Sequence, residues 1–215
     1  MDRPEYNHHH QCTGKLRRGP SSLRMHDPEV VFDQLSLKPG DLGCGPGEYT
    51  IHAARLVGDS GVVYALEKWA YMIDGLTQEA AAQGLANLKP MTADITQPLS
   101  IKDKSIDVCL LSTVLHIFDL SKIEKTLFNE IRRVLKPDGR VAVIECKKED
   151  QPFGPPKHMR LSAEDLEASF VRYGFEKIRL TDLGFNYMVQ FRIVKMSTHS
   201  PPYVTCHPAS TSPKA

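Results

Sequence analysis

The chain has 215 residues, and its 27 Lys and Arg nearly balance its 26 Asp and Glu, for a formal net charge of +1. This length fits one domain with tails and is enough to bury a substantial core. The balanced charge lacks the strongly basic character of a nucleic-acid-binding surface, so no nucleic-acid partner is expected. The longest apolar stretch, around residues 108–118, is too short to span a bilayer, so no membrane span is expected either.

The cysteines are scattered along the chain and form no C-x-x-C pair. They are Cys12, Cys44, Cys109, Cys146 and Cys206. This pattern disfavours zinc or redox chemistry and favours a reduced, cytoplasmic protein, and the polar N-terminus predicts no signal peptide. The run His8-His9-His10 near Cys12 carries metal-ligating side chains, but adjacent histidines in a flexible segment more often bind nothing specific, so no metal site is expected.

Both ends of the chain have the composition of tails. Residues 1–26 show little apolar periodicity and are predicted to form a flexible arm, and residues 197–215 are rich in Ser, Thr and Pro and are predicted to be disordered. The domain is therefore expected over residues 27–196. It opens with Asp27 as an N-cap and Pro28 at the first position of a helix that runs to Leu35.

Helix and strand patterns alternate through the next segment. A helix is predicted over 49–57, ended by Gly58, and a short buried strand over 62–66. A helix is predicted over 72–88, followed by a third strand that ends near residue 94. Another buried strand is predicted over 106–111.

The C-terminal half continues the alternation. Ser121 and Glu124 have the spacing of a capping box, ahead of a helix that stops at Lys136-Pro137-Asp138-Gly139. A strand over 141–144 and a helix from Ser162 to Tyr173, stopped by Gly174, come next. Two final strands, 175–183 and 187–194, are joined through Gly184.

This order of elements predicts an α/β fold. Continuous apolar strands that alternate with helices imply a parallel sheet covered by helices on both faces. Only a few residues join the last two strands, so these two must pair antiparallel. The sequence therefore predicts a mostly parallel sheet that ends in an antiparallel hairpin.

The stretch Asp41-Leu42-Gly43-Cys44-Gly45-Pro46-Gly47 is the most informative motif in the chain. Its alternating glycines predict a backbone turn that no side chain obstructs, against which a ligand can lie. The helix predicted to follow offers free N–H groups and the positive end of its dipole to an anionic part of that ligand. Ordinary loops also contain such runs, and the nicotinamide dinucleotide fingerprint has the different spacing G-x-G-x-x-G.

In its G-x-G-x-G spacing the motif resembles the first signature of class I S-adenosylmethionine-dependent methyltransferases. The matching pieces follow the family's order from about Asp27 to Lys195. The resemblance implies a Rossmann-like doubly wound fold, the cofactor S-adenosyl-L-methionine and a small-molecule acceptor. It is closest to the group that includes quinone-biosynthesis and arsenite methyltransferases. The arsenite branch depends on reactive cysteines, whereas Cys44 and Cys109 here fall in a predicted turn and a predicted strand.

The resemblance also assigns roles to residues at the carboxyl ends of the predicted strands, where open α/β sheets bind ligands. The glycines would seat the methionine end. Glu67, 20 residues after Gly47, would accept hydrogen bonds from the ribose, with a solvated strand-end carboxylate as the alternative. Asp94 and Ile95 would hold adenine, although Asp in such a loop is often only a turn residue. The expected cofactor-binding residues are Asp41, Gly43, Cys44, Gly45, Gly47, Glu67, Lys68, Met72, Asp94, Ile95 and Ser112.

The segment from Ser112 to His116 follows the strand over 106–111, and in similar proteins it passes under the methionine moiety and faces the acceptor. The Asn/Asp-Pro-Pro-aromatic signature of methyltransferases that modify amino groups of DNA or protein is missing, which argues against a base or amide nitrogen as acceptor. His116 could orient the acceptor or take its proton as a catalytic residue. Packing against a helix face is the equal alternative for this side chain.

The sequence departs from the family's pattern at the first strand. Similar proteins place a run of buried apolar residues between a Lys-Pro-Gly turn and the acidic D-L-G, whereas here Lys38-Pro39-Gly40 runs straight into Asp41. About four residues of a strand that is buried on both faces are therefore missing. Either Leu35 to Leu37 are drawn in to rebuild the strand, or the domain is weakened and its glycine turn displaced. Such a loss would lower the free energy of unfolding by several kcal/mol, out of about 5–15 kcal/mol for a typical domain.

Three functional hypotheses follow. The leading one is transfer of a methyl group from S-adenosylmethionine to a small-molecule acceptor. The alternative is a non-catalytic methyltransferase-like protein whose cofactor site is impaired by the shortened strand. The third, a nicotinamide-dependent oxidoreductase, is disfavoured by the glycine spacing. The sequence leaves the acceptor and the oligomeric state open.

Overall fold

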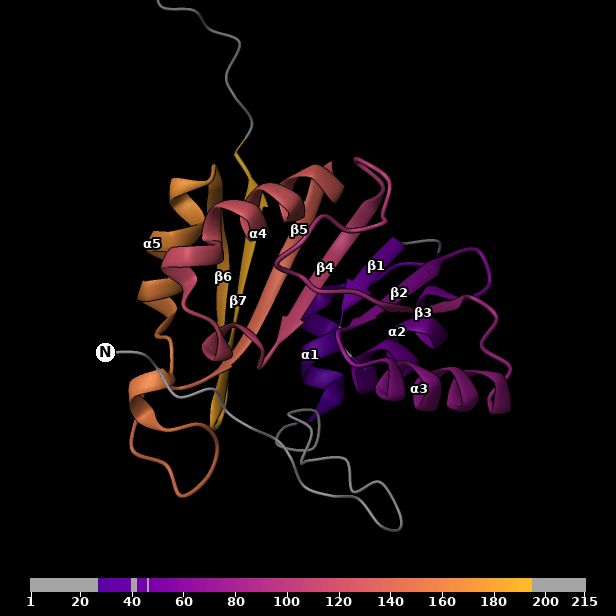
Figure 1. Ribbon diagram of the computed structural model, residues 1–215, viewed down its shortest axis with the longest axis horizontal. Coiled ribbons are helices and arrows are strands. Elements are labelled where there is room, and N and C mark those ends of the chain that lie inside the picture. Colours follow the sequence, from indigo (N-terminus) through magenta and orange to yellow (C-terminus); the bar gives the residue numbers. More distant parts are fainter. Residues whose placement is uncertain (1–26, 40–41, 46, 195–215) are drawn as a thin grey trace, which may run out of the picture.

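The computed structural model describes residues 27–39, 42–45 and 47–194, so the predicted arm and the predicted tail lie outside the described residues (Figure 1). The strands are β1 Leu42–Gly45, β2 Val62–Glu67, β3 Leu88–Thr92, β4 Ile106–Ser112, β5 Leu135–Cys146, β6 Phe175–Leu183 and β7 Asn186–Ile193. The α-helices are α1 Pro28–Leu35, α2 Gly47–Val57, α3 Ala70–Ala82, α4 Leu120–Val134 and α5 Ala163–Arg172. Two short 3-10 turns, Leu115–Ile117 and Lys157–Met159, complete the described elements.

These strands form one sheet with the order β3-β2-β1-β4-β5-β7-β6. The pairs from β3 across to β5 are parallel, and β7 pairs antiparallel with both β5 and β6. The predicted mostly parallel sheet ending in an antiparallel hairpin is therefore confirmed. Strand order reverses beside β1, between β2 and β4, which is where ligands bind in doubly wound sheets.

Helices cover both faces of the sheet, as predicted. Val108 and Leu110 of β4 pack in a cluster with residues of α1, whereas Cys109 and Leu111 pack in a cluster with residues of α4 and α5. Alternate residues of a strand point to opposite faces, so α1 lies on one face and α4 and α5 on the other (Figure 1). A third cluster joins α2 and α3 to β2 and β3.

The capped helix ends follow the sequence signals. The Asp27 side chain accepts a hydrogen bond of 2.9 Å from the Glu29 amide, and α1 starts at Pro28 as predicted. Ser162 and Asp165 form a reciprocal capping box at the start of α5, with bonds of 3.1 and 3.2 Å.

Two helix predictions need correction. The helix predicted over 72–88 begins earlier and ends sooner, because Gly84 takes a left-handed φ of 67° after α3, and Leu88 already begins β3. The capping box predicted from Ser121 and Glu124 is wrong. Helix α4 begins at Leu120, with Asp119 at the N-cap position, and the Ser121 hydroxyl donates a 2.7 Å bond to the Asp119 carboxylate.

The turn predicted at Lys136-Pro137-Asp138-Gly139 ends α4, but it also belongs to β5. The register with β4 shifts between Ile106 and Val108, so this segment bulges out of the ladder. A Cβ on Gly139 would lie 2.8 Å from the Ile106 carbonyl oxygen, a contact too close for any side chain. Glycine is therefore required where β5 passes the start of β4.

The largest core cluster lies between the sheet and the helices α4 and α5. At its centre Phe170 stacks on Phe191 with ring centroids 4.1 Å apart and contacts Phe128 at 4.4 Å. All three rings are fully buried. This half of the molecule is therefore closely packed.

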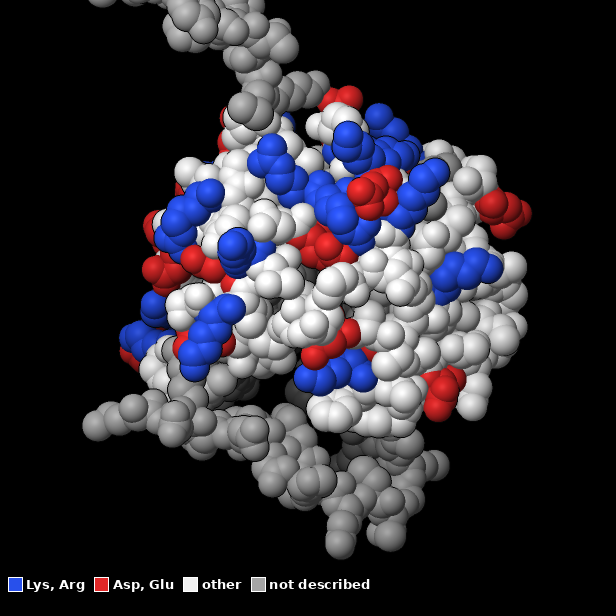
Figure 2. All heavy atoms as spheres, turned by 45° about the horizontal axis from the view of Figure 1, so that its top comes forward, with Lys and Arg blue, Asp and Glu red and all other residues white. Residues whose placement is uncertain are grey.

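The surface shown in Figure 2 carries Lys and Arg side chains interspersed with Asp and Glu, and much of the rest is uncharged. This face therefore offers no continuous basic band for a nucleic-acid backbone. Among the described helices, none is both long and apolar enough to cross a membrane.

Candidate functional site

The carboxyl end of β2 carries Glu67, which the sequence predicts as the ribose ligand. Its carboxylate accepts a 2.8 Å hydrogen bond from the Lys68 amide and a longer bond of 3.4 Å from the Trp69 amide. These bonds hold the carboxylate at the turn into α3, whose N-cap residue Trp69 supplies no side-chain cap. Glu67 is therefore held at the sheet edge, where it is half-buried.

Asp94 lies just beyond β3 and is fixed by its own loop. Its carboxylate accepts bonds from the Thr96 hydroxyl at 2.7 Å and the Thr96 amide at 2.9 Å, and it pairs with Lys68 Nζ at 3.0 Å. The Thr96 hydroxyl bond is the main cause that holds the pKa of Asp94 below its usual range, and Lys68 adds to it. The carboxylate is therefore charged at neutral pH. The Ala93 amide donates to the Glu67 carbonyl oxygen at 2.9 Å, which ties the two loops together.

The chain leaves β4 through a tight turn. Thr113 takes a left-handed φ of 48°, a strained conformation for a β-branched residue, and its amide donates a 2.7 Å bond to the Ile144 carbonyl oxygen. This bond ties the turn to β5 and sets the direction of the segment that follows.

The His116 ring is held by a buried carboxylate. Its Nδ1 lies 2.8 Å from Glu145 Oε2, and Glu145 Oε1 accepts bonds from the Leu115 amide at 2.7 Å and the His116 amide at 3.4 Å. Only 1% of the Glu145 side chain is exposed, against 12% for His116. Sequence reasoning missed Glu145, and its acidic position inside an apolar strand, Val141 to Cys146, was the available signal.

The residues around these strand ends line a cavity of about 460 Å³. The cavity size falls in the range of small-molecule sites. Every sequence-predicted cofactor residue whose side chain the structure describes is part of its lining: Glu67, Lys68, Met72, Asp94, Ile95 and Ser112. The tertiary structure thus brings together residues from the ends of three strands. From the segment after β4, Thr113, Val114, Ile117 and Phe118 line the cavity. His116, predicted as catalytic, is not part of this lining, and its ring is bonded to Glu145.

Apolar side chains surround this cavity at the surface. Trp69, Met72 and Ile117 line it and are 56%, 41% and 58% exposed. Sequence reasoning missed Trp69 and Ile117, although Trp69 is the single tryptophan of the chain and follows the strand-end glutamate by two residues. Large exposed apolar side chains beside a cavity are typical of a site that receives an apolar ligand.

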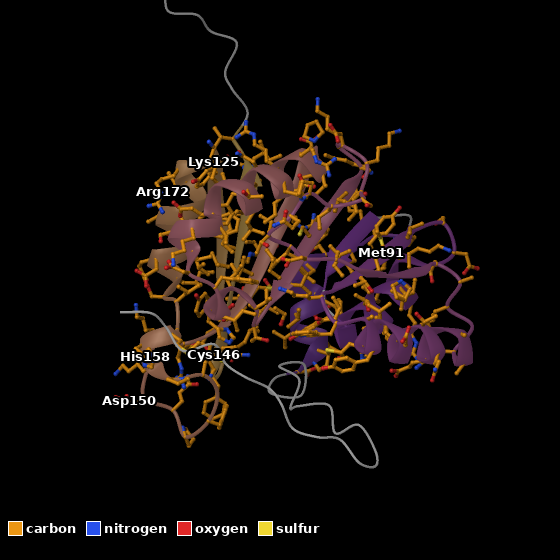
Figure 3. All side chains as sticks on the ribbon, in the orientation of Figure 1. Met91, Lys125, Cys146, Asp150, His158 and Arg172 are labelled. Atoms are coloured by element: carbon orange, nitrogen blue, oxygen red, sulfur yellow. The ribbon has the colours of Figure 1, made fainter. Side chains whose placement is uncertain are left out.

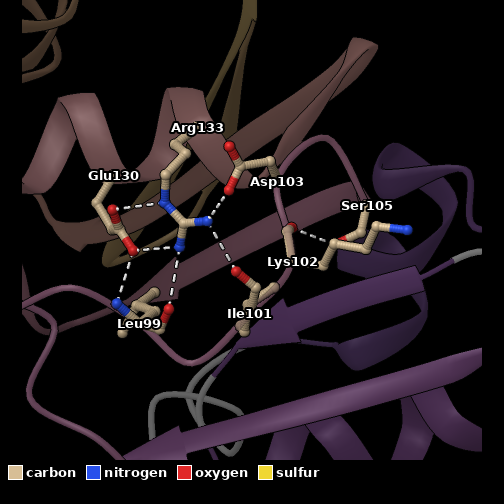
Figure 4. Close-up of polar contacts among 7 residues, drawn as sticks. All are labelled: Leu99, Ile101, Lys102, Asp103, Ser105, Glu130 and Arg133. Carbon is tan, nitrogen blue, oxygen red and sulfur yellow. Dashed lines mark hydrogen bonds and ion pairs between the residues drawn. The ribbon is translucent and has the colours of Figure 1, made fainter.

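One wall of the cavity is held by a cluster of polar contacts on α4 (Figure 4). Glu130 accepts a 2.6 Å bond from the Leu99 amide and two bonds from Arg133, at 2.9 and 2.5 Å. Arg133 also donates to the carbonyl oxygens of Leu99 at 3.0 Å and Ile101 at 2.8 Å, and it pairs with Asp103. The bonds to Arg133 are the main cause that lowers the pKa of Glu130. The loop that carries Leu99 is therefore bound to α4.

One arginine holds the segment after β5 in place through hydrogen bonds to its backbone. Arg160 is 4% exposed and donates to the carbonyl oxygens of Pro155, Lys147, Glu149 and Phe153, at 2.7, 3.1, 2.7 and 2.9 Å. Figure 3 places this segment, with Asp150 and His158, beside Cys146 at the carboxyl end of β5. Sequence reasoning missed the role of Arg160.

The glycine motif is the predicted feature that the structure places differently. Its residues Leu42 to Gly45 form β1 itself, and α2 begins at Gly47. Asp41 and Pro46 lie outside the described residues. The motif therefore supplies the central strand, instead of forming a turn beyond a separate strand.

The alternative in which Leu35 to Leu37 rebuild the strand is wrong. Leu35 is the last residue of α1 and is buried, and the left-handed Ser36 ends that helix. Arg140 of β5 donates to the carbonyl oxygens of both Leu35 and Ser36, which pins the end of α1 to the neighbouring part of the sheet.

Comparisons with known proteins agree with this geometry. A family model described as a methyltransferase domain matches residues 39–197. The demethylmenaquinone methyltransferase of Lactobacillus johnsonii is 32% identical over 127 residues, which are 57% of this chain and 50% of that protein. The arsenite methyltransferase of Halobacterium salinarum is 26% identical over 151 residues, which are 65% of this chain and 37% of that protein.

The chain thus spans half or less of the length of these curated relatives. Among solved structures, a SAM-dependent methyltransferase from Aquifex aeolicus has a TM-score of 0.73 at 26% identity. That likeness covers 82% of this chain and 94% of the other.

Proposed function

Because this chain belongs to the class I S-adenosylmethionine-dependent methyltransferases, we propose that it transfers the methyl group of S-adenosylmethionine to a small, largely apolar acceptor. The single observation that carries the proposal is the lining of the 460 Å³ cavity. It combines the carboxylates Glu67 and Asp94, which we propose bind the donor, with exposed apolar side chains beside them.

The adenosine half of the donor is proposed to lie across the ends of β2 and β3. Glu67 accepts hydrogen bonds from the ribose hydroxyls, and Asp94, with Ile95 against the ring, accepts one from the exocyclic amine of adenine. A hydrogen bond to a charged group contributes about 1.5–3 kcal/mol. The lowered pKa of Asp94 supports this role, because it keeps the carboxylate charged and able to accept. In this arrangement the Asp94 carboxylate binds both Lys68 and the amine of the ligand.

The acceptor is proposed to enter past Trp69, Met72 and Ile117. These side chains present apolar surface that suits a planar, poorly soluble ring. The name of the Lactobacillus johnsonii relative supports a reduced quinone ring as the acceptor. An arsenite acceptor is less well supported, because Cys109 and Cys146 are buried and burial raises the pKa of the Cys146 thiol.

His116 is proposed as the residue that receives the acceptor's proton. The Glu145 carboxylate at 2.8 Å fixes the imidazole at Nδ1, which leaves Nε2 as the nitrogen that can act on the acceptor. The donor's sulfonium supplies an already activated methyl group. The chain therefore contributes alignment, exclusion of water and the removal of one proton.

A reduced, cytoplasmic setting completes the proposal. It is supported by the scattered cysteines, which form no C-x-x-C pair, and by the buried free thiol of Cys146.

The test is methyl transfer from S-adenosylmethionine, supplied at millimolar concentration, to a naphthoquinol that lacks the ring methyl. Product formation supports the proposal, and transfer to none of a set of quinol, phenol and arsenite acceptors by the folded protein contradicts it. Glu67→Ala is expected to weaken donor binding at least about tenfold, or 1.4 kcal/mol, in calorimetric titration with S-adenosylhomocysteine. Glu164→Ala, on the exposed face of α5, is the matched control and should leave the affinity unchanged. Unchanged affinity in Glu67→Ala would remove Glu67 from the site.

A second candidate function is a methyltransferase-like protein that binds nucleoside but does not transfer a methyl group. The observation that favours it is the four-residue central strand β1. Methyl transfer to any acceptor in the assay above refutes this second candidate.

A further inference from the structure

Thr113 takes a backbone conformation that its residue type disfavours. Among the described residues other than glycine, positive φ angles occur at Ser36, Lys104 and Thr113. Ser36 ends helix α1 and Lys104 lies in the turn before β4, whereas Thr113 lines the 460 Å³ cavity. Thr113 is also the β-branched residue of the three, and a φ of 48° is a genuine outlier for such a side chain. Backbone strain beside a cavity points to a functional role for the strained residue.

The fold requires the turn at this position, and it does not require the threonine side chain. The Thr113 amide donates a 2.7 Å bond to the Ile144 carbonyl oxygen. The Glu145 carboxylate then accepts bonds from the Leu115 and His116 amides, at 2.7 and 3.4 Å. All three donors are backbone N–H groups, which every residue except proline supplies. Glycine would adopt the same φ without strain, so the threonine side chain needs a reason outside the turn itself.

The bonding of the Thr113 hydroxyl supplies such a reason. The carboxylates of Glu67, Asp94 and Glu130, which also line the cavity, each accept hydrogen bonds from neighbouring groups of the chain. The Thr113 hydroxyl, in contrast, has no hydrogen-bond partner in the part of the chain that the structure describes. Thr113 is half-buried beside the apolar Val114. A ligand that covers this hydroxyl removes its water and must offer a hydrogen-bonding atom in return.

The position of Thr113 across the sheet points to the acceptor as that ligand. Ser112 ends β4, and the registers through β1 place it about level with Glu67 at the end of β2. With β1 between them, these two strands lie about 10 Å apart. Asp94 follows β3, one strand further away. An adenosine that spans Glu67 and Asp94 therefore leaves the Thr113 end of the cavity, beside Ile117, to the acceptor.

We propose that Thr113 determines acceptor specificity and that its hydroxyl forms a hydrogen bond with an oxygen substituent on the acceptor's ring. It favours a hydroxylated aromatic ring over an oxygen-free ring of the same size, because the oxygen-free ring leaves the covered hydroxyl without a partner. This role rests on the proposed function, in which the acceptor occupies this end of the cavity.

Four variants separate the hydroxyl from the backbone strain. Thr113→Val keeps the size and β-branching of the side chain and removes the hydroxyl, whereas Thr113→Ser keeps the hydroxyl. Thr113→Gly removes the hydroxyl together with the strain, so it tests the same loss in a turn that glycine adopts freely. Lys104→Gly is the matched control, because it relieves a φ of 50° in the turn at the opposite end of β4.

The probes are 1-naphthol and naphthalene, which share a ring system and differ by one hydroxyl. Equilibrium dialysis measures the binding of each to the full chain saturated with S-adenosylhomocysteine. Calorimetric titration measures the affinity for S-adenosylhomocysteine itself, and circular dichroism with thermal unfolding establishes that each variant is folded.

Thr113→Val and Thr113→Gly are expected to bind 1-naphthol about tenfold or more weakly than the native chain does, and Thr113→Ser within about threefold of it. In Thr113→Val the affinities for naphthalene and for S-adenosylhomocysteine should stay within about threefold of the native values. Lys104→Gly should match the native chain with every ligand.

Native affinity for 1-naphthol in Thr113→Val overturns the inference, and so does an equal loss for 1-naphthol and naphthalene, which would assign the side chain to packing. A loss of S-adenosylhomocysteine affinity in the folded variant places the hydroxyl at the donor and also overturns it. If Thr113→Val does not fold, Thr113→Gly decides by its 1-naphthol affinity. These outcomes leave the proposed function intact. If the folded native chain binds neither S-adenosylhomocysteine nor 1-naphthol, the proposed function falls with the inference.

Discussion

The two halves of the sheet differ in how they are built. The half made of β4, β5, β7 and β6 has strands of 7, 12, 8 and 9 residues and carries the largest core cluster. The half made of β1, β2 and β3 has strands of 4, 6 and 5 residues and leaves a small cavity beside its central strand.

The difference separates the closely packed core from the residues that we propose bind the donor. The long half positions Glu145, His116 and the segment after β5 through many backbone bonds and stacked aromatic rings. The short half carries Glu67 and Asp94, whose positions depend on local loop bonds at the strand ends. The short strand therefore lies in the half that carries the proposed donor site, away from the aromatic core.

The largest effect is expected from the aromatic centre of the long half. Phe170→Ala removes a fully buried ring that stacks on Phe191 and contacts Phe128, so the free energy of unfolding should fall by about 3–5 kcal/mol. Urea titration measures the loss. The neighbouring Val171→Ala, at a side chain 54% exposed, is the control and should change stability by no more than about 0.5 kcal/mol. A loss in Phe170→Ala of less than about 1 kcal/mol would contradict the contrast between the halves.

The contacts of Arg133 in α4 with the loop between β3 and β4 should give the next largest effect. Arg133→Ala leaves the buried Glu130 carboxylate and the carbonyl oxygens of Leu99 and Ile101 without their donor, at a cost of about 2–3 kcal/mol. Arg133→Lys should recover little, because one ammonium cannot reach the same acceptors. Equal stability of the lysine variant and the native chain would show that the positive charge of Arg133, and not its set of hydrogen bonds, provides the stabilisation.

Acidification should weaken the ion pair between Glu130 and Arg133. The folded chain holds the pKa of Glu130 below its usual range, mainly through Arg133, so folding favours the charged carboxylate. This stabilisation is complete above the ordinary glutamate pKa of about 4.3 and is lost as the pH falls from there through the lower folded pKa. Glu130→Gln should therefore lose less stability between pH 5 and pH 3 than the native chain does. A parallel loss in both chains would assign the acid sensitivity to other carboxylates.

The smallest effect is a gain in the short half. Gly75 lies inside α3, where an added Cβ would meet no atom within 4 Å. Alanine is favoured over glycine in a helix interior, so Gly75→Ala should stabilise the fold by about 0.5–1 kcal/mol. Differential scanning calorimetry would detect the higher Tm. A lower Tm would indicate that the helix at Gly75 passes another part of the chain too closely for a side chain.

The sequence by itself determined the α/β class, the antiparallel hairpin and the family, because periodicity and glycine spacing report local backbone preferences and apolar faces. Capped helices such as α1 and α5 were predicted correctly, since Asp27 and Ser162 satisfy amides within a few residues. The end of α3 was missed, because apolar residues continue past Gly84 into β3 with a spacing that suits either element.

Only the tertiary structure decided how the glycine motif is used and which buried groups support the site. The pairing of Glu145 with His116 joins residues 29 positions apart, and Arg133 reaches loop residues more than 30 positions away, so no local pattern encodes either contact. The missing strand residues were visible in the sequence, but their consequence was not. Arg140 pins α1 to β5, and the ladder with β2 then draws Leu42–Gly45 into the sheet. The register of a central strand is set by what it pairs with on both sides, and those partners are distant in sequence.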